Sequence, residues 1–158
     1  MRFRLINQKK PAPIPNVESP VKANVICAGA ILVKKDAFLF GKRSAKKDWA
    51  PGLWDIVGGK SLKNELPLFT LQRETLEETG VQVLDAELLT SADVARTDDN
   101  APLFRYHIYM VKHFKGKPKN KTREHTKLQW FTREALEELP LALPEYLPLI
   151  DEWLAKNR

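Results

Sequence analysis

The longest run of apolar residues in the chain, from Val25 to Val33, indicates a β-strand that is buried on both faces. The run has nine residues and is rich in β-branched side chains. Residues 34–36 are polar and predict a turn, after which residues 37–40 return as a second strand. We therefore expect a β-hairpin over residues 25–40, followed by a polar loop over 42–52 and a short apolar segment over 53–57.

Residues 66–79 have the pattern of a helix that covers a core. Pro67 stands in its first turn and Gly80 follows its last, which is the usual placement of these residues at helix ends. Four residues recur at helical spacing and are expected to face the core: Leu68, Leu71, Thr75 and Leu76. This helix is the clearest in the sequence.

The second half of the chain alternates between strand and helix patterns. Residues 81–89, 103–114 and 128–131 are typical of strands. Thr132 caps a helix that Pro140 ends, and residues 146–154 form an amphipathic C-terminal helix. Strands and helices in this order predict an α/β fold with a mixed sheet and helices packed on its faces.

The N-terminus has a different composition. Four prolines at positions 11, 13, 15 and 20 remove backbone donors and fix φ at short intervals. We therefore expect an extended arm over residues 1–21 and one domain over 22–158, because 158 residues suit a single core. The single cysteine, Cys27, excludes an internal disulfide.

Two further features concern location. A membrane span needs about 20 apolar residues, more than twice the longest run here, so we expect no membrane partner. Lys9 and Lys10 follow the first residues in place of an apolar segment, so the sequence predicts no secretory signal and a cytoplasmic protein.

The positive charge of the chain is concentrated in one segment. The net charge is 26 − 20 = +6, and residues 112–127 alone carry seven basic residues against the single acid Glu124, which is also 7 − 1 = +6. The remainder is neutral. A solvated loop explains such a segment, so a nucleic-acid partner is not expected from the charge alone.

Three carboxylates give the first indication of chemistry. Glu74, Glu77 and Glu78 are spaced by three and four residues, which places them on one side of the helix over 66–79. Like charges at this spacing repel one another, and near a helix C-terminus they also oppose the macrodipole. Mg²⁺ would neutralise such a cluster of hard oxygen ligands. The alternative is an ordinary glutamate-rich exposed face.

The residues around these carboxylates complete a longer motif. The chain reads Gly59, five residues, Glu65, seven residues, then Arg73-Glu74-Thr75-Leu76-Glu77-Glu78-Thr79-Gly80-Val81. This resembles the Nudix box of the MutT-like Nudix hydrolases, and all its fixed positions match. Thr75 replaces a bulky aliphatic residue, and Asn64-Glu65-Leu66 replaces a more usual Gly-Glu-Ser or Gly-Glu-Thr. Asn64 still permits a positive φ, whereas Leu66 cannot cap the helix.

The resemblance implies a Nudix-type α/β/α sandwich and a function. Such enzymes use Mg²⁺ or Mn²⁺ to hydrolyse the pyrophosphate linkage of a nucleoside diphosphate joined to a group X, and they release a nucleoside monophosphate. It implies as metal ligands Glu74, Glu77, Glu78 and the carbonyl of Gly58, with Glu74 or a neighbour accepting the proton of water. It implies structural roles for Gly59, Glu65, Arg73 and Gly80, in which Glu65 and Arg73 pair bidentately.

Residues outside the motif complete the expected site. Glu124 is a candidate additional metal ligand, the alternative being a surface acid among lysines, and His125 beside it is expected to be exposed. The candidate contacts for a small nucleotide substrate are Arg43, Trp49 and Arg105.

Two other functions stay open at this point. One is a regulatory module that binds a nucleotide without turnover. The other is a pyrophosphohydrolase of RNA 5′ ends that uses residues 112–127 as a track. The group X and the oligomeric state are not indicated by any motif.

Overall fold

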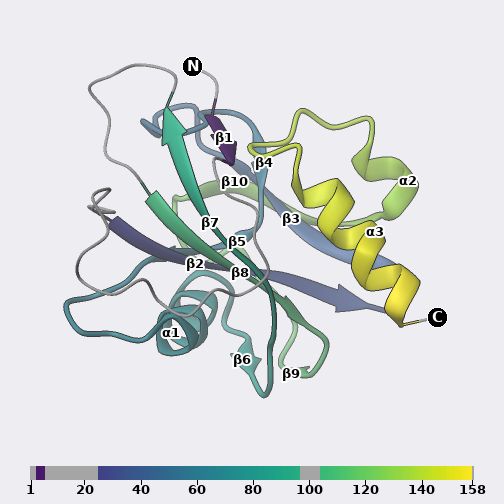
Figure 1. Cartoon of the computed structure of the whole chain (residues 1–158), viewed down its shortest axis with the longest axis horizontal. Coiled ribbons are helices and arrows are strands. Elements are labelled where there is room, and N and C mark those ends of the chain that lie inside the picture. The colour runs from purple at the N-terminus through teal and green to yellow at the C-terminus, as the bar shows by residue number, and fades with distance from the viewer. Residues whose placement is uncertain (1–2, 6–24, 97–103, 158) are drawn as a thin grey trace.

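The computed structural model describes residues 3–5, 25–96 and 104–157 of the chain, and its elements follow the predicted alternation of strands and helices (Figure 1). The strands are β1 (Phe3–Leu5), β2 (Val25–Lys34), β3 (Ala37–Arg43), β4 (Trp54–Asp55), β5 (Val57–Lys60), β6 (Gln82–Val83), β7 (Glu87–Arg96), β8 (Phe104–Val111), β9 (Phe114–Lys115) and β10 (His125–Thr132). The helices are α1 (Pro67–Thr79), α2 (Arg133–Leu136) and α3 (Tyr146–Lys156).

The main sheet is mixed. Its order is β1-β7-β8-β2-β3-β10, and within it β2 and β8 run parallel, from the pair Val25↔Phe104 to the pair Leu32↔Val111. The pairs β1–β7, β7–β8, β2–β3 and β3–β10 are antiparallel, and β6 and β9 form a separate small sheet. The mixed sheet predicted from the sequence is confirmed.

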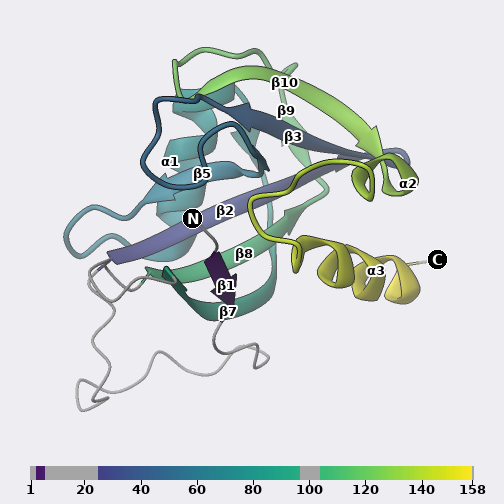
Figure 2. The ribbon, with the colours of Figure 1, turned by 90° about the horizontal axis from the view of Figure 1, so that it is seen from above.

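The β2–β3 hairpin opens soon after its turn. Only Val33↔Phe38 and Lys34↔Ala37 pair the two strands, so their far ends separate (Figure 2). The short strands β4 and β5 fill the opening: β4 pairs with β3, and β5 pairs with β2 through Gly29↔Gly58 and Ala28↔Gly59. The opening of the hairpin therefore allows Gly58 and Gly59 to pair with β2.

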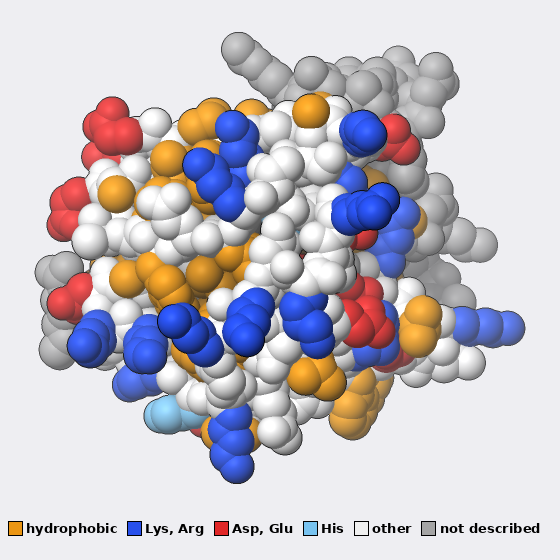
Figure 3. Space-filling view, turned by 180° about the vertical axis from the view of Figure 1, so that it is seen from behind, with side chains coloured by type: hydrophobic (Ala, Val, Ile, Leu, Met, Phe, Trp, Pro, Cys, Tyr) orange, Lys and Arg blue, Asp and Glu red, His pale blue; other side chains and the backbone are white. Residues whose placement is uncertain are grey.

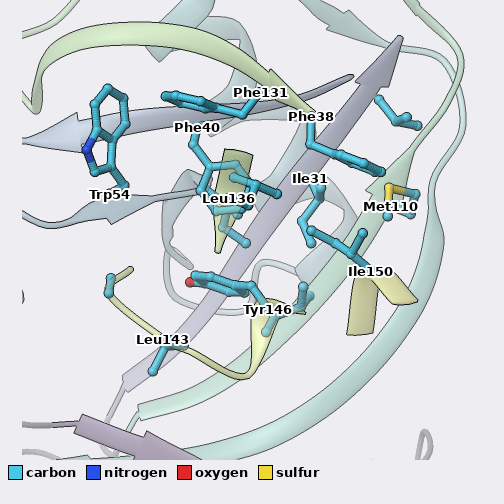
Figure 4. Packing of buried hydrophobic residues seen from close by; sticks show 14 of the residues in the cluster. Ile31, Phe38, Phe40, Trp54, Met110, Phe131, Leu136, Leu143, Tyr146 and Ile150 are labelled. Atoms are coloured by element: carbon cyan, nitrogen blue, oxygen red, sulfur yellow. The ribbon is translucent and has the colours of Figure 1, made fainter. Parts of the chain in front are cut away.

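Two hydrophobic cores lie on the two faces of β2, because successive side chains of a strand point to opposite sides. One core contains Ile31 with residues of α2 and α3, among them Leu136 and Tyr146 (Figure 4). The other contains Ala28, Ala30 and Leu32 with Leu71 of α1. Figure 2 shows α1 and α3 on opposite sides of β2, so the arrangement is the expected α/β/α sandwich.

Helix α1 begins and ends as the sequence indicates, but its buried face differs. Leu66 at its N-cap makes no side-chain capping bond, and Gly80 adopts the left-handed conformation at its C-terminus. Leu71 and Thr75 are buried, whereas Leu68 and Leu76 are exposed, so their assignment to the core was wrong. The buried stripe also contains Thr70, Glu78 and Thr79. The helix therefore turns a partly polar face towards the sheet.

Several boundaries also differ from the sequence expectation. The segment 81–89 divides into β6 and the start of β7, and between these strands the N–H groups of Leu84 and Asp85 donate to the carbonyl of His113. The segment 53–57 divides into β4 and β5. Helix α2 ends at Leu136, three residues before the expected end at Leu139, although Thr132 caps it as predicted.

The N-terminal arm meets the sheet at its edge. The pairs Phe3↔Arg96, Arg4↔Ala95 and Leu5↔Val94 add β1 beside β7. The other residues of the predicted arm, 1–2 and 6–21, lie outside the described residues, so the division at residue 21 stays a prediction. Within the described ranges, no helix is long and apolar enough to cross a membrane.

The close pairing of β5 with β2 predicts a strong requirement for glycine at position 58. Its φ is +155°, and a Cβ atom there would lie 2.2 Å from the carbonyl oxygen of Ala28. We expect Gly58→Ala to lower the free energy of unfolding by about 3 kcal/mol through backbone displacement. Gly52→Ala is the control: φ is +73° and nothing lies within 4 Å of its Cβ position, so only conformational strain of about 1 kcal/mol is expected. Denaturant unfolding with equal losses in both variants would contradict this account.

Candidate active site

A cavity of about 360 Å³ opens between the β4–β5 segment, α1 and the start of β10. One wall carries the motif residues Gly58, Gly59, Glu74 and Glu78. The opposite wall carries residues of β3, of the loop after it, of the β9–β10 connection and of the start of β10. These residues are Arg43, Lys47, Trp49, Glu124 and His125. The lining also contains Cys27, Val94, Phe104 and Tyr106. Acidic and basic side chains therefore face each other across a partly apolar space.

The glycine pair brings the backbone of β5 against the carboxylates of α1. The Gly58 N–H donates to Oε2 of Glu78 at 3.2 Å. A Cβ atom on Gly59 would lie 2.5 Å from the Glu74 carboxyl carbon, so a side chain there would displace the Glu74 carboxylate from its present position. These two contacts fix one end of the cavity.

The loop between β5 and α1 is held by Glu65 and Arg73. Arg73 donates from Nε to Oε2 and from Nη2 to Oε1 of Glu65, both at 2.9 Å, and also to the carbonyl of Lys60 at 3.0 Å. Glu65 additionally accepts from the N–H of Leu62 and the hydroxyl of Thr70. The Arg73 hydrogen bonds lower the pKa of Glu65 to about 2. The bidentate pair implied by the motif resemblance is present.

Glu78 is a buried carboxyl group with an unusual electrostatic environment. Its exposed fraction is 4%, and burial raises its pKa to about 9, assisted by repulsion from Glu74 and Glu124 and opposed by the Gly58 N–H. Burial also raises the pKa of Glu74. Among the described residues, no Lys or Arg lies within ion-pair distance of Glu78. A positive charge placed here would stabilise the ionised form.

The carboxylates fit a divalent cation in chemistry and position. Hard oxygen donors around a partly hydrated site suit Mg²⁺, and Glu74, Glu78 and Glu124 all line the cavity. Within the described ranges, no three acidic, histidine or cysteine side chains already stand close enough to hold an ion. Like charges on such carboxylates repel one another, and a cation between them would offset this repulsion.

Glu77 is placed differently from the other two. Its side chain is 56% exposed and does not line the cavity, and Oε2 lies 3.4 Å from Nη1 of Arg73. The same Nη1 is 2.7 Å from Oε1 of Glu74, so one guanidinium joins the two carboxylates at the rim. The expected grouping on one side of the helix is observed, although only two of its members enter the cavity.

Glu124 reaches the cavity from the opposite wall. Its carboxylate lies 2.6 Å from Nζ of Lys47, and its backbone carbonyl accepts from the N–H of Ser44 at 3.0 Å. Burial raises the pKa of Glu124, but the Lys47 hydrogen bond and charge outweigh this effect and hold the pKa below its usual range. An ionised carboxylate thus faces the carboxyl groups of α1.

His125 is buried, so the expectation that it is exposed was wrong. Its exposed fraction is 5%, and its ring packs so closely on Gly41 that a Cβ there would lie 2.5 Å from Cδ2. Burial lowers the pKa of His125 to about 4, so the ring is neutral at neutral pH. Its position follows from the pairing of β3 with β10, which sets His125 opposite Arg43 next to an irregularity in the register.

Two of the three candidate substrate contacts line the cavity. Arg43 donates from Nε to the Trp49 carbonyl at 2.8 Å, and its guanidinium carbon lies 4.8 Å from the centre of the Trp49 ring. Arg105 is absent from the lining and pairs with Asp93 at 2.9 Å. The assignment of Arg105 to substrate binding is therefore corrected: alternation along β8 turns Phe104 and Tyr106, its two neighbours, towards the cavity.

Sequence reasoning missed Asp55, which lies in the wall behind Arg43. Its carboxylate is 2% exposed and accepts from the Tyr146 hydroxyl at 2.5 Å, the Ile56 N–H at 2.9 Å and Nη1 of Arg43 at 3.4 Å. Burial raises the pKa of Asp55. An acidic residue inside the apolar segment 53–57 was the signal that could have identified it.

Comparisons with known proteins agree with this geometry. The family described as NUDIX domain matches residues 23–153. The CTP pyrophosphohydrolase of Escherichia coli K12 is 30% identical over 126 residues, covering 80% of this chain and 88% of that protein. A putative 8-oxo-dGTP diphosphatase 2 of Mycobacterium tuberculosis H37Rv is 28% identical over 133 residues, covering 83% of this chain and 85% of that one.

Solved structures show the same fold. The E. coli ORF135 protein superposes with a TM-score of 0.66 at 29% identity and covers 83% of this chain and 89% of that one. A MutT NUDIX hydrolase from Burkholderia pseudomallei gives a TM-score of 0.65 at 28% identity, with 70% and 84% covered. The MutT protein of Methanosarcina mazei Go1 gives 0.70 at 21% identity, with 85% and 95% covered.

The Arg73 contacts predict that this residue supports the fold as well as the site. Arg73→Ala leaves Glu65 and Glu74, whose side chains are 14% and 18% exposed, without their cation. We expect a loss of about 2 kcal/mol in unfolding free energy together with reduced turnover. Arg133→Ala is the matched control, because its partner Asp151 is 52% exposed and stays solvated. An unchanged melting temperature for Arg73→Ala, with turnover lost, would instead assign Arg73 to the substrate.

Proposed function

Because the chain belongs to the Nudix hydrolase family, we propose that it hydrolyses nucleoside triphosphates to a nucleoside monophosphate and pyrophosphate at the cavity between α1 and β10. Hydrolysis of a phosphorus anhydride in a nucleotide is the activity that its family and relatives share. The names of two relatives, one for CTP and one for 8-oxo-dGTP, support a triphosphate as the substrate. The observation that carries the proposal is the buried Glu78 carboxyl group held against Gly58 and facing Glu124.

The residues suited to hold the metal are the carboxylates on the two walls of the cavity. Glu74 and Glu78 from α1, Glu124 from the opposite wall and the carbonyl of Gly58 would form the coordination sphere, with Glu77 joining from the rim. A bound Mg²⁺ or Mn²⁺ supplies the positive charge that phosphate oxygens need as negative charge develops on them. Burial, together with repulsion from Glu74 and Glu124, raises the pKa of Glu78, and a cation at this place would stabilise the ionised carboxylate.

Cationic side chains on the other wall suit the remaining phosphate charge. Arg43 is fixed by the Trp49 carbonyl and by Asp55, so little side-chain entropy is lost when its other donors bind an oxyanion. Lys47 reaches the same space beside Glu124, and Lys60 borders it from β5. These groups orient the polyphosphate so that the anhydride bond lies beside the carboxylates.

The apolar and aromatic part of the cavity lining suits the nucleoside. Val94, Phe104 and Tyr106 offer apolar surface to a base, and Cys27 lies beside them. A volume of about 360 Å³ is within the range for small-molecule sites.

The hydrolytic step needs one water molecule and one proton acceptor. The oxygen of water forms a bond to phosphorus while the anhydride P–O bond breaks, and a carboxylate of the cavity takes the water proton. Glu74 stands beside Gly59, and Glu124, whose pKa lies below its usual range, stands on the opposite wall. Either can act as the acceptor. The regulatory alternative has no specific support, because the acidic residues of the motif are intact.

Neutral substitutions of the buried acids test the metal assignment. We expect Glu74→Gln and Glu78→Gln each to lower turnover about 100-fold or more, since an amide is a poor ligand for a hard cation. The exposed Glu138→Gln, outside the cavity, serves as the control. EDTA should abolish activity and added Mg²⁺ should restore it. Full activity in both cavity variants, or activity in EDTA, would refute the assignment.

The products test the bond that is cleaved. A panel of nucleoside triphosphates that includes CTP and 8-oxo-dGTP, incubated with Mg²⁺, is expected to yield the monophosphate and pyrophosphate in equal amounts. Each reaction is repeated with the Glu78→Gln protein, which excludes a contaminating hydrolase. Release of the diphosphate and inorganic phosphate instead would show that the proposed cleavage site is wrong.

A further inference from the structure

Basic residues alternate along the connection between β9 and β10. Positions 115, 117, 119 and 121 are lysine and position 123 is arginine, and every one of these five side chains is exposed. We call these five residues the lysine ladder. Where a chain is extended, every second side chain lies on the same side, about 6 to 7 Å from the next. Residues 117–121 contain no bend, so the lysines at 117, 119 and 121 form a linear array. Lys115 precedes Gly116, whose φ is +103°, and Arg123 lies in the bend over 122–124.

The backbone of the ladder is held against the C-terminal end of α1. The N–H groups of Lys119 and Lys121 donate to the carbonyls of Thr79 and Glu78, both at 3.0 Å. Two donors separated by one residue and directed to the same helix end fix this stretch in an extended form, so their side chains share a side. A Cβ on Gly116 would lie 3.3 Å from the carbonyl oxygen of Gly80, which shows how closely the start of the connection packs.

The ladder leads to the cavity. Lys121 lies beside Gly80, because a Cβ atom on Gly80 would lie 3.3 Å from Cδ of Lys121. Glu124 and His125, three and four residues after Lys121, line the cavity. At the other end, Phe114 stacks on Trp130 of β10 with ring centres 6.4 Å apart and an interplanar angle of 19°, and both rings are partly buried. Figure 3 shows that many Lys and Arg side chains, with a group of acidic side chains beside them, lie on the face of the molecule opposite to that of Figure 1.

We propose that the lysine ladder binds the phosphate backbone of a single-stranded nucleic acid. A linear array of cations matches one strand, whose successive phosphates also repeat at a single short distance. The partly exposed Phe114–Trp130 pair beside it adds aromatic surface of the kind on which bases stack. This partner goes beyond the free nucleotides of the proposed function, and it replaces the expectation from the sequence that the segment is only a solvated loop.

A purely structural role for these lysines has a different signature. Helix α1 has no basic residue in its own last turn, and cations near a helix C-terminus stabilise it. This role requires charge near Lys119 and Lys121 and affects stability. It does not require an array that extends to Lys115 and Arg123, nor any affinity for a polyanion.

Fluorescence anisotropy with a labelled oligouridylate that carries a 5′-hydroxyl tests the proposal. This probe has no anhydride bond, so its binding is independent of hydrolysis. For the wild-type protein we expect binding at low salt that weakens with a log–log slope of about −3.5, the value for five phosphate contacts on a single strand. Replacing Lys117, Lys119 and Lys121 by Ser should reduce that slope by about 2 and the affinity by about tenfold or more at low salt.

Two matched variants separate site binding from net charge and from folding. Replacing the exposed Lys34, Lys35 and Lys156 by Ser removes the same charge elsewhere and should change the affinity less than about twofold. Replacing the three ladder lysines by Arg keeps the charge and should keep binding, whatever the Ser variant does to stability. Nucleotide hydrolysis at physiological salt should remain in all three.

Several results would overturn the proposal. These are an absence of wild-type binding at low salt, equal losses in the two Ser variants, and loss of binding in the Arg variant. A preference for phosphatidylserine vesicles over the oligonucleotide would assign the ladder to an anionic membrane instead. If hydrolysis fails while the oligonucleotide still binds as expected, the proposed function is wrong and the ladder assignment stands.

Discussion

The contact between the buried Glu78 carboxyl group and the backbone of Gly58 is the constraint on which the rest of the site depends. It requires β5 to lie on β2 more closely than a side chain would allow, and it requires α1 to stand with a polar stripe against the sheet. The Glu65–Arg73 pair holds the connecting loop at the length that satisfies both conditions. The opening of the β2–β3 hairpin leaves the space in which these elements meet.

This arrangement suits the function of the site but lowers the stability of the folded protein. The pKa of Glu78 rises from 4.5 to about 9 on folding, so the folded protein binds this proton more tightly than the unfolded chain does. Stability from this group is therefore greatest below about pH 4.5 and falls as the pH rises towards 9. In the proposed function, a divalent cation would replace this proton and offset the cost of burying the ionised carboxylate. Arg43 and Lys47 on the opposite wall would compensate the remaining charge of a polyphosphate.

Sequence reasoning succeeded where the relevant distances are local. Helical spacing placed Glu74 and Glu78 together, and Asn64 takes the positive φ of 64° that its position requires. Sequence reasoning failed where strand pairing decides which side chains are buried. His125 is buried because β10 pairs with β3, and the alternation of side chains along β8 directs Arg105 away from the cavity. Hydrophobic periodicity did not show that α1 buries Thr70 and Glu78 in place of Leu68 and Leu76, since motif chemistry overrides apolar packing there.

The central claim is that Glu78 is a buried carboxyl group whose ionised form needs a cation. Thermal unfolding with and without Mg²⁺ tests it directly, at about pH 8, which lies between the unfolded and folded pKa values of this group. The account predicts that Glu78→Gln melts above the wild type in EDTA, because the amide keeps the Gly58 hydrogen bond without a charge. It also predicts that saturating Mg²⁺ stabilises the wild type, by about 2.7 kcal/mol at 100 times its dissociation constant, and the variant far less. A variant that melts below the wild type in EDTA, or that gains as much from Mg²⁺, would contradict it.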